Sequence, residues 1–295
     1  MASTQDLNRR ITSVTNTRKI TRAMEMVAAA KLRKAQERIE QLRPFADALV
    51  ELTARVAGGS RGAAAHPLLA EREVSSVCLV VFTGDRGLAG ALNANVLRRT
   101  LELTREWTDK GATVHHIAVG RRGTASLRFR DIDLDETFTG ITDNPAFRDA
   151  EAIATGIIDR FMQGEYDRVE LVYNHFASAI NQIIEHQPLL PLSDQALLDA
   201  VSGTSEHGGV DPDWEFEPSE DGLLDRLLPT YVEQTIFRAL LESTASEHGA
   251  RMTAMRNATD NAGEMLDTLT LERNRVRQAA ITQEILEIVG GAAAL

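Results

Sequence analysis

The chain has 295 residues and a formal net charge of −11, with 43% hydrophobic and 25% charged side chains. This composition is typical of a globular protein and excludes a largely disordered chain, a collagen-like fibre and a disulfide scaffold. The aromatic share of 5% is low for an all-β sandwich or barrel. Cys78 is the single cysteine, so it cannot form an internal disulfide, and a reducing compartment is expected.

No segment is apolar enough to predict a membrane span. The longest run free of Asp, Glu, Lys and Arg is 171–184, and it contains Asn174, His175 and Asn181. A helical span needs about 20 mainly apolar residues. We also expect no secretory signal and no organelle leader, because the N-terminus is charged from Asp6 onward with no apolar segment behind it.

Charge is distributed unevenly along the chain. Residues 1–43 carry ten lysines and arginines against four acidic residues, whereas residues 193–226 carry ten acidic residues and one arginine. This asymmetry indicates two surfaces that meet different partners, although two solvated faces would explain it equally well. Nucleic acid is not expected as a partner, because the basic segment has no aromatic residue before Phe45 to stack on bases.

The N-terminal segment predicts one long amphipathic helix from Gln5 to about Val56. Its apolar residues recur at steps of three and four, and neither glycine nor proline occurs before Pro44. Pro44 is expected to bend the helix without ending it. The glycine-rich residues 58–62 then end it.

The middle of the chain alternates between strand and helix patterns. Strands are predicted over Val77–Phe82, Thr113–Val119, Ile132–Phe138, Arg168–Tyr173 and Ile180–Leu192, and helices over Ala91–Trp107 and Ala146–Met162. This alternation predicts a small, mostly parallel α/β sheet. Residues 203–222 form a turn-rich acidic connector.

A second long helix is predicted from about Ser219 to Val289, with a kink at Pro229. Two long amphipathic helices at opposite ends of one chain most simply pack on each other, antiparallel, with Val27 and Ile285 expected in the buried contact. The predicted fold class is therefore α/β plus long helices. Its segments are an N-terminal helix (1–57), an α/β domain (70–192), an acidic connector (193–218) and a C-terminal helix (219–295).

Candidate catalytic chemistry is sparse. Gly84–Gly90 (GDRGLAG) lies where a phosphate-binding loop would sit, between a strand and a helix, but its glycine spacing fits neither common nucleotide motif. We prefer a tight strand-to-helix turn. His115 and His116 are adjacent on a strand and point to opposite faces, so they cannot share a metal. We expect no catalytic residue, no metal and no cofactor.

The chain ends in small and apolar residues, Gly290–Leu295. A smooth apolar tip suggests insertion into a hydrophobic sleeve formed by a partner. A terminus tucked against its own partner helix is the alternative, and composition does not separate the two.

Four segments carry a resemblance to a known family. They read TRKITRAMEMVAAAKLRKAQ, TGDRGLAGALN, ATDNAGEMLDTL and RQAAITQEILEIVGGAAAL, in that order along the chain. The chain thereby resembles the γ subunits of rotary F-type ATP synthases.

The resemblance implies a central rotor shaft, one copy per complex. The terminal helices would form an antiparallel, left-handed coiled coil inside the hexamer of α and β subunits, with a Rossmann-like α/β foot beside the ε subunit and the membrane c-ring. Chemistry would belong to the β subunits, and this chain would transmit torque at the cytoplasmic face of a bacterial membrane.

The resemblance also assigns three groups of residues. A polar catch that hydrogen-bonds a β-subunit loop would comprise Arg277, Gln278 and Thr282. The residues near an acidic β-subunit loop in the cavity of the hexamer would be Arg9, Arg10, Met24 and Lys31. The contact of the foot with the ring would comprise Trp214, Phe216 and Glu217.

Two other classes of function remain open at this point. A nucleotide-dependent enzyme would use the 84–90 turn and bind nucleotide as an isolated chain. A generic coiled-coil adaptor would self-associate through the long helices.

Overall fold

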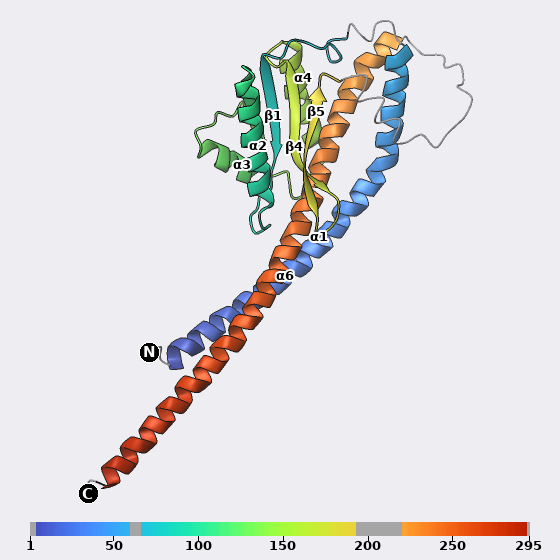
Figure 1. Ribbon diagram of the computed structural model, residues 1–295. Helices are drawn as coiled ribbons and strands as arrows, with labels where there is room; N and C mark the ends of the chain where they lie inside the picture. Colours follow the sequence, from blue (N-terminus) through green and yellow to red (C-terminus); the bar gives the residue numbers. More distant parts are fainter. Residues whose placement is uncertain (1–3, 60–65, 193–219, 294–295) are drawn as a thin grey trace. The chain divides into compact units, whose positions relative to one another are not determined.

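The computed structural model describes residues 4–59, 66–192 and 220–293. They fall into two compact units: a helix-pair unit before residue 30 and after residue 250, and an α/β unit, Ala30–Ala250. The helices and strands, drawn in Figure 1, are α1 (Thr4–Gly59), β1 (Ser76–Phe82), α2 (Leu92–Asp109), β2 (Thr113–Val119), α3 (Arg121–Arg128), β3 (Glu136–Phe138), α4 (Phe147–Met162), β4 (Arg168–Phe176), β5 (Gln182–Leu190) and α6 (Glu220–Ala293).

The two predicted long helices are present. α1 has 56 residues with Pro44 inside it, and α6 has 74 residues with Pro229 inside it. In the α/β unit they run antiparallel: residues 39–47 of α1 border the same cavity as residues 238–242 of α6, and residues 46–50 border another cavity with residues 231–238. The predicted fold class, a sheet flanked by long N- and C-terminal helices, is confirmed.

The sheet has five strands in the order β3-β2-β1-β4-β5. β1 pairs in parallel with β2 and β4, β2 pairs in parallel with β3, and β5 lies antiparallel to β4. The chain builds outward from β1 to β3 and then returns to the other side of β1. The strand order therefore reverses between β1 and β4, and such a switch point opens a crevice beyond the carboxyl ends of the strands.

β1 is buried on both faces, as its continuous apolar sequence predicts. Val77, Leu79 and Val81 pack against α2, whereas Cys78, Val80 and Phe82 belong to a larger cluster on the opposite face. The second cluster also contains residues of α4 and α6. One strand thus holds together two layers of side chains.

Two elements differ from the sequence-based prediction. α3, eight residues with the sequence RRGTASLR, was not predicted, because it is short, polar and contains Gly123. The exposed strand expected over Ile132–Phe138 shortens to Glu136–Phe138, which pairs only with Ile117–Val119. Ile132 and Leu134 instead pack beside Leu127 of α3, so their apolar character reflects a loop that covers a helix.

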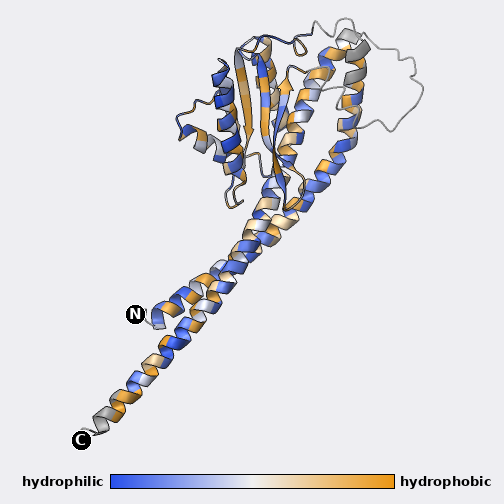
Figure 2. Cartoon of the chain, in the orientation of Figure 1, coloured by the Kyte–Doolittle hydropathy of each residue, from blue (hydrophilic) through white to orange (hydrophobic). Residues whose placement is uncertain are grey.

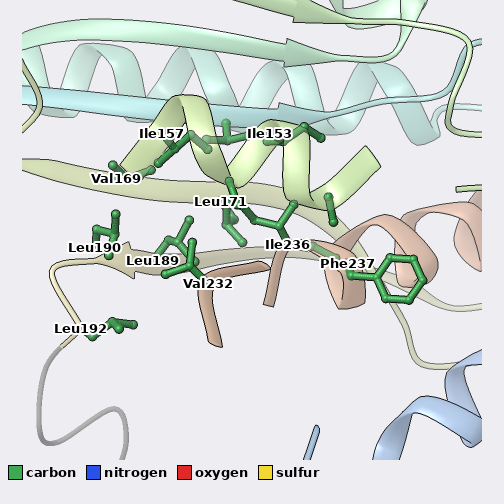
Figure 3. Close-up of a cluster of buried hydrophobic side chains, with 14 of the residues drawn as sticks. Ile153, Ile157, Val169, Leu171, Leu189, Leu190, Leu192, Val232, Ile236 and Phe237 are labelled. Carbon is green, nitrogen blue, oxygen red and sulfur yellow. The ribbon is translucent and has the colours of Figure 1, made fainter. Parts of the chain in front are cut away.

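α6 is part of the core of the α/β unit. Figure 3 shows Val232, Ile236 and Phe237 of α6 facing side chains of α4, β4 and β5. Figure 2 shows the strands of the sheet as largely hydrophobic. The C-terminal helix therefore acts as a third layer on the sheet.

Among the described residues, no helix combines the length and the apolar character needed to span a bilayer. The predicted division into segments 1–57, 70–192, 193–218 and 219–295 stays a prediction.

Replacing Ile236 by Ala tests the role of α6 in this core. Ile236 is fully buried, so the truncation should cost about 2–5 kcal/mol of unfolding free energy, measured by urea denaturation. Ile180→Ala is the matched control, because Ile180 is 83% exposed, and it should change stability by less than about 0.5 kcal/mol. Equal effects of the two variants would contradict the packing of α6 on the sheet.

Candidate functional site

In the helix-pair unit, α1 and α6 meet through polar side chains. The hydroxyls of Thr21 and Thr259 lie 2.7 Å apart, and Arg256 donates from Nε to Oε1 of Glu25 at 3.1 Å. Arg22 also donates to Glu25 at 3.2 Å. Because the earlier residue on α1 meets the later residue on α6, the helices run antiparallel here too.

The side chains buried in this unit are small or polar as often as they are large and apolar. Thr21, Glu25 and Ala28 of α1 are buried, as are Thr259 and Ala262 of α6. Most large apolar side chains of the unit point outward instead. Apart from the last turns of α6, the large apolar side chains of this unit that are more than half exposed are Ile20, Met26, Val27, Met265 and Leu271.

The expectation that Val27 and Ile285 lie in the buried contact is wrong. Val27 is 56% exposed and Ile285 is 54% exposed. Thr21, Glu25 and Ala28 take the inward positions. The face of α1 that contacts α6 is therefore not the face that carries its most hydrophobic side chains. A 3.6-residue period identifies a helix but leaves open which neighbouring stripe faces the partner.

The final turns of α6 are exposed throughout their described side chains. From Arg277 to Val289 each described side chain is exposed in the chain alone. Five large apolar residues contribute to this surface: Ile281, Ile285, Leu286, Ile288 and Val289. These described turns are therefore not covered by α1, and Figure 2 shows hydrophobic residues alternating with polar ones along them. The side chains of the predicted tip, Gly290–Leu295, lie outside those described, so the two alternatives for the tip stay open.

The proposed catch residues lie on this exposed stretch. Arg277, Gln278 and Thr282 are all exposed, and Gln278 and Thr282 are one turn apart on the same helix face. The Thr282 hydroxyl donates to the Gln278 carbonyl at 2.9 Å, which leaves its oxygen lone pairs as acceptors. Of the predicted cavity residues in this unit, Arg9 and Arg10 are exposed and Met24 is half-buried.

Lys31, the fourth predicted cavity residue, lies in the α/β unit and has a partner within the chain. Its ammonium Nζ lies 2.7 Å from Oδ1 of Asp143. Burial raises the pKa of Asp143, but the hydrogen bond and charge of Lys31, with Arg86 and His248, hold it below its usual 3.8. The predicted foot residues Trp214, Phe216 and Glu217 lie outside the described residues.

The 84–90 segment forms a tight turn organised by Asp85. The Asp85 carboxylate accepts hydrogen bonds from the backbone amides of Arg121, Gly140 and Thr142, and from the Thr142 hydroxyl at 2.9 Å. Burial raises the pKa of Asp85, but these hydrogen bonds outweigh it and hold the pKa below 3.8. Leu88 and Gly90 have φ of 63° and 59°, which fits a turn rather than an open loop.

The switch-point crevice beside this turn is filled by α6. A Cβ placed on Gly84 would lie 2.6 Å from the Glu247 carboxylate, and Ser246 donates to the carbonyl of Asn174 near the end of β4 at 3.0 Å. A dinucleotide would need this crevice and would meet a carboxylate there. The geometry therefore favours the tight turn over the nucleotide site.

The histidines predicted to diverge do so. His115 lies 2.9 Å from Asp135, whereas Nε2 of His116 lies 2.9 Å from the Thr104 hydroxyl on α2. Burial and the neighbouring His115 lower the pKa of His116 to about 4, against a smaller opposing effect of Asp135. Each histidine has its own structural partner.

One group of metal-capable side chains was missed by sequence reasoning, because its members come from β4, β5 and α6. Ligand atoms of His175, Glu185 and Glu242 lie within 4.8 Å of one another. Nδ1 of His175 is 2.6 Å from Glu242, and Nε of Arg238 is 3.5 Å from the other oxygen of Glu242. Arg238 already supplies a positive charge beside Glu242, which is the role that a metal cation would play. We therefore interpret the group as an ion-pair network.

Comparison with known proteins agrees with this arrangement. Residues 3–295 match the family model described as ATP synthase. The ATP synthase gamma chain of Desulforamulus reducens is 47% identical over 295 residues, covering all of both chains. The chain belongs to the ATP synthase γ-chain family. The gamma chain of Rubrobacter xylanophilus is 46% identical and is covered to 99% of its length.

Solved structures agree with the family. The chain is 31% identical to a chain in the central stalk and c-ring structure of Tetrahymena thermophila mitochondrial ATP synthase, with a TM-score of 0.59 over 81% of this chain and 99% of that one. A Euglena gracilis mitochondrial ATP synthase chain, 19% identical, shares the fold at a TM-score of 0.67 over 99% of this chain and 94% of that one. This γ chain is a central-stalk subunit of the F-type ATP synthase and not a catalytic subunit.

Replacing Asp85 by Asn tests the turn. The variant loses charge-assisted hydrogen bonds and should be less stable by about 1–3 kcal/mol at neutral pH, measured by urea denaturation. Because the pKa of Asp85 is lowered in the folded chain, its contribution is complete above 3.8 and is lost as the pH falls through the lowered value. The difference between the two proteins should therefore shrink below that pH. A constant difference would contradict the assigned role of the carboxylate.

Two aspartate substitutions test which face of α1 is inward. Ala28→Asp places a charge at a buried position and should lower the thermal unfolding temperature, because an unpaired buried charge is costly. Val27→Asp is the matched control at an exposed neighbour and should leave the unfolding temperature unchanged. The reverse order would show that the contact face is assigned wrongly.

Proposed function

We propose that this γ chain is the rotating shaft that couples ion flow through the membrane ring to ATP synthesis or hydrolysis at the β subunits. The observation that carries the proposal is the exposed surface of the helix-pair unit. Its inward contacts include small and polar side chains, while large apolar side chains face outward and cover the last turns of α6. Exposed apolar patches of this kind mark a surface made for a partner.

The proposed partner is the hexamer of α and β subunits, which would surround the helix pair. Each orientation of the shaft would favour one β-subunit conformation over the others. This difference in binding free energy would shift the nucleotide affinity of each catalytic site in turn. The chain itself would hold no cofactor and perform no chemistry.

The proposed contacts suit a surface that must move. Arg277, Gln278 and Thr282 would form the catch for a β-subunit loop, and exposed polar groups of this kind make weak contacts that can break and reform. Arg9, Arg10 and Met24 would face the acidic β-subunit loop. Lys31 would have to share its ammonium with Asp143, so we expect it to contribute least.

At the other end, the α/β unit would form the foot on the c-ring beside the ε subunit, with Trp214, Phe216 and Glu217 at the ring. One copy per complex would lie at the cytoplasmic face of the bacterial membrane. The alternative, a coiled-coil adaptor, would self-associate through the same helices.

Replacing Arg277 and Gln278 together by Ala tests the catch. Loss of charge-assisted hydrogen bonds at the driving contact should reduce ATPase turnover of the complex assembled with α and β subunits by about tenfold, equivalent to about 1.4 kcal/mol. It should also weaken assembly on a sizing column. Arg105→Ala, an exposed arginine of α2, is the control and should change neither.

Unchanged turnover and unchanged assembly of the double variant would refute the catch. Self-association of the wild-type chain with no capture of α and β subunits would instead favour the adaptor.

A further inference from the structure

α6 is attached to the α/β unit in two chemically different ways. Along residues 224–241 it packs through buried apolar side chains such as Val232 and Ile236, which Figure 3 shows against α4, β4 and β5. This close packing holds the helix against the sheet by shape and buried area, but it contains no directional bond that specifies the rotation of the helix about its own axis.

Immediately beyond this apolar band, α6 becomes polar and stays buried. Thr244, Ser246, Glu247 and His248 are each no more than 5% exposed. The Thr244 hydroxyl lies 2.8 Å from both the Thr142 carbonyl and the Leu240 carbonyl of its own helix, which share its one proton, and Ser246 donates to the Asn174 carbonyl at 3.0 Å. These directional contacts fix which side of α6 faces the sheet.

Glu247 adds a steric contact at the same level. Its carboxylate occupies the space where Gly84 would carry a Cβ, so any larger residue at position 84 must displace it. Gly84 is itself held from both sides, because its amide donates to Asn93 at 2.9 Å and its carbonyl accepts from Arg122 at 3.1 Å. The carboxylate therefore rests on a rigid turn.

The loop after β3 reaches both long helices. The Thr142 carbonyl accepts from α6, and Asp143 pairs with Lys31 of α1 and lies 3.9 Å from His248 of α6. Arg38 of α1 donates to the side-chain oxygen of Asn144 at 2.8 Å. Asp85 ties this loop to the 84–90 turn through Thr142. We call residues 83–85 and 142–145 together the collar.

We propose that the collar is the rotational lock of the γ chain, a point at which torque passes between the sheet and the parts of both long helices that lie in the α/β unit. The inference rests on the proposed function. It adds positioning residues, Gly84, Glu247 and Thr244, that are expected to touch neither nucleotide nor the catalytic subunits.

The lock matters because it joins the sheet side of the molecule to both long helices through side-chain contacts at one level. The apolar band resists rotation by close packing, and the polar contacts beyond it add directional resistance. The hydrogen bonds and the steric contact of Glu247 resist rotation of α6 about its own axis, and the Lys31–Asp143 pair extends the resistance to α1.

The test uses the complete ATP synthase in lipid vesicles, carrying Glu247→Gln, Gly84→Ala or Thr244→Val. ATP hydrolysis and ATP-driven ion uptake are measured per assembled complex, with a pH-sensitive dye for protons and labelled sodium for sodium ions. Hydrolysis should persist in each variant, whereas the number of ions moved per ATP should fall below that of wild type. Glu71→Gln, an exposed carboxylate in the same unit, should match wild type.

A ratio of ions to ATP equal to that of wild type in all three variants overturns the lock, including when both activities fall in parallel, which is the result of a purely structural role. Thr244→Val is nearly isosteric, so it keeps the test open if Gly84→Ala does not assemble. Failure of the proposed function is separate, since the wild-type complex would then show no coupled ion uptake.

Discussion

The packing of α6 into the α/β unit is the contact on which the remaining structure depends. Because the apolar band of α6 packs against β4 and β5, the sheet and residues 224–241 of α6 share one core. The same helix then fills the crevice at the switch point, where folds of this class otherwise bind a ligand. In this chain the crevice of the doubly wound sheet holds a helix instead of a ligand, and the Glu247 carboxylate lies beside Gly84 in that crevice.

The helix-pair unit is stabilised by different contacts from the α/β unit. Thr21, Glu25 and Ala28 at the contact bury little apolar area, so they contribute only modest hydrophobic stability to the pairing of α1 with α6. The larger hydrophobic side chains face outward and remain available to the surrounding subunits. Stability of the shaft is thus shared between the chain and its partners, and the buried Thr21–Thr259 hydroxyl pair specifies how the two helices are aligned.

Much of the fold could be predicted from the sequence, because the signals were local. The buried strand β1, the end points of β2 and both long helices follow from apolar runs and helical periodicity. The incorrect predictions concern residues whose environment is set by contacts with distant parts of the chain. α3 is too short and polar to give a periodic signal, and Ile132 and Leu134 are apolar because they cover Leu127. The sequence predicts that Val27 and Ile285 face the other long helix, because a hydrophobic stripe on a helix normally faces the helix it packs against. In a shaft, the second neighbour is another protein. The collar could not be foreseen, since its members lie in distant parts of the chain.

The exposed apolar residues on the last turns of α6 also bear on how the cell handles this chain before assembly. A free copy presents Ile281, Ile285, Leu286 and Ile288 to water, together with outward residues of α1 such as Ile20 and Val27. Exposed apolar side chains in this number promote non-specific association in a protein that has no partner. Surplus copies are therefore prone to precipitate or to be degraded, and the yield of soluble chain should follow the supply of its partner subunits.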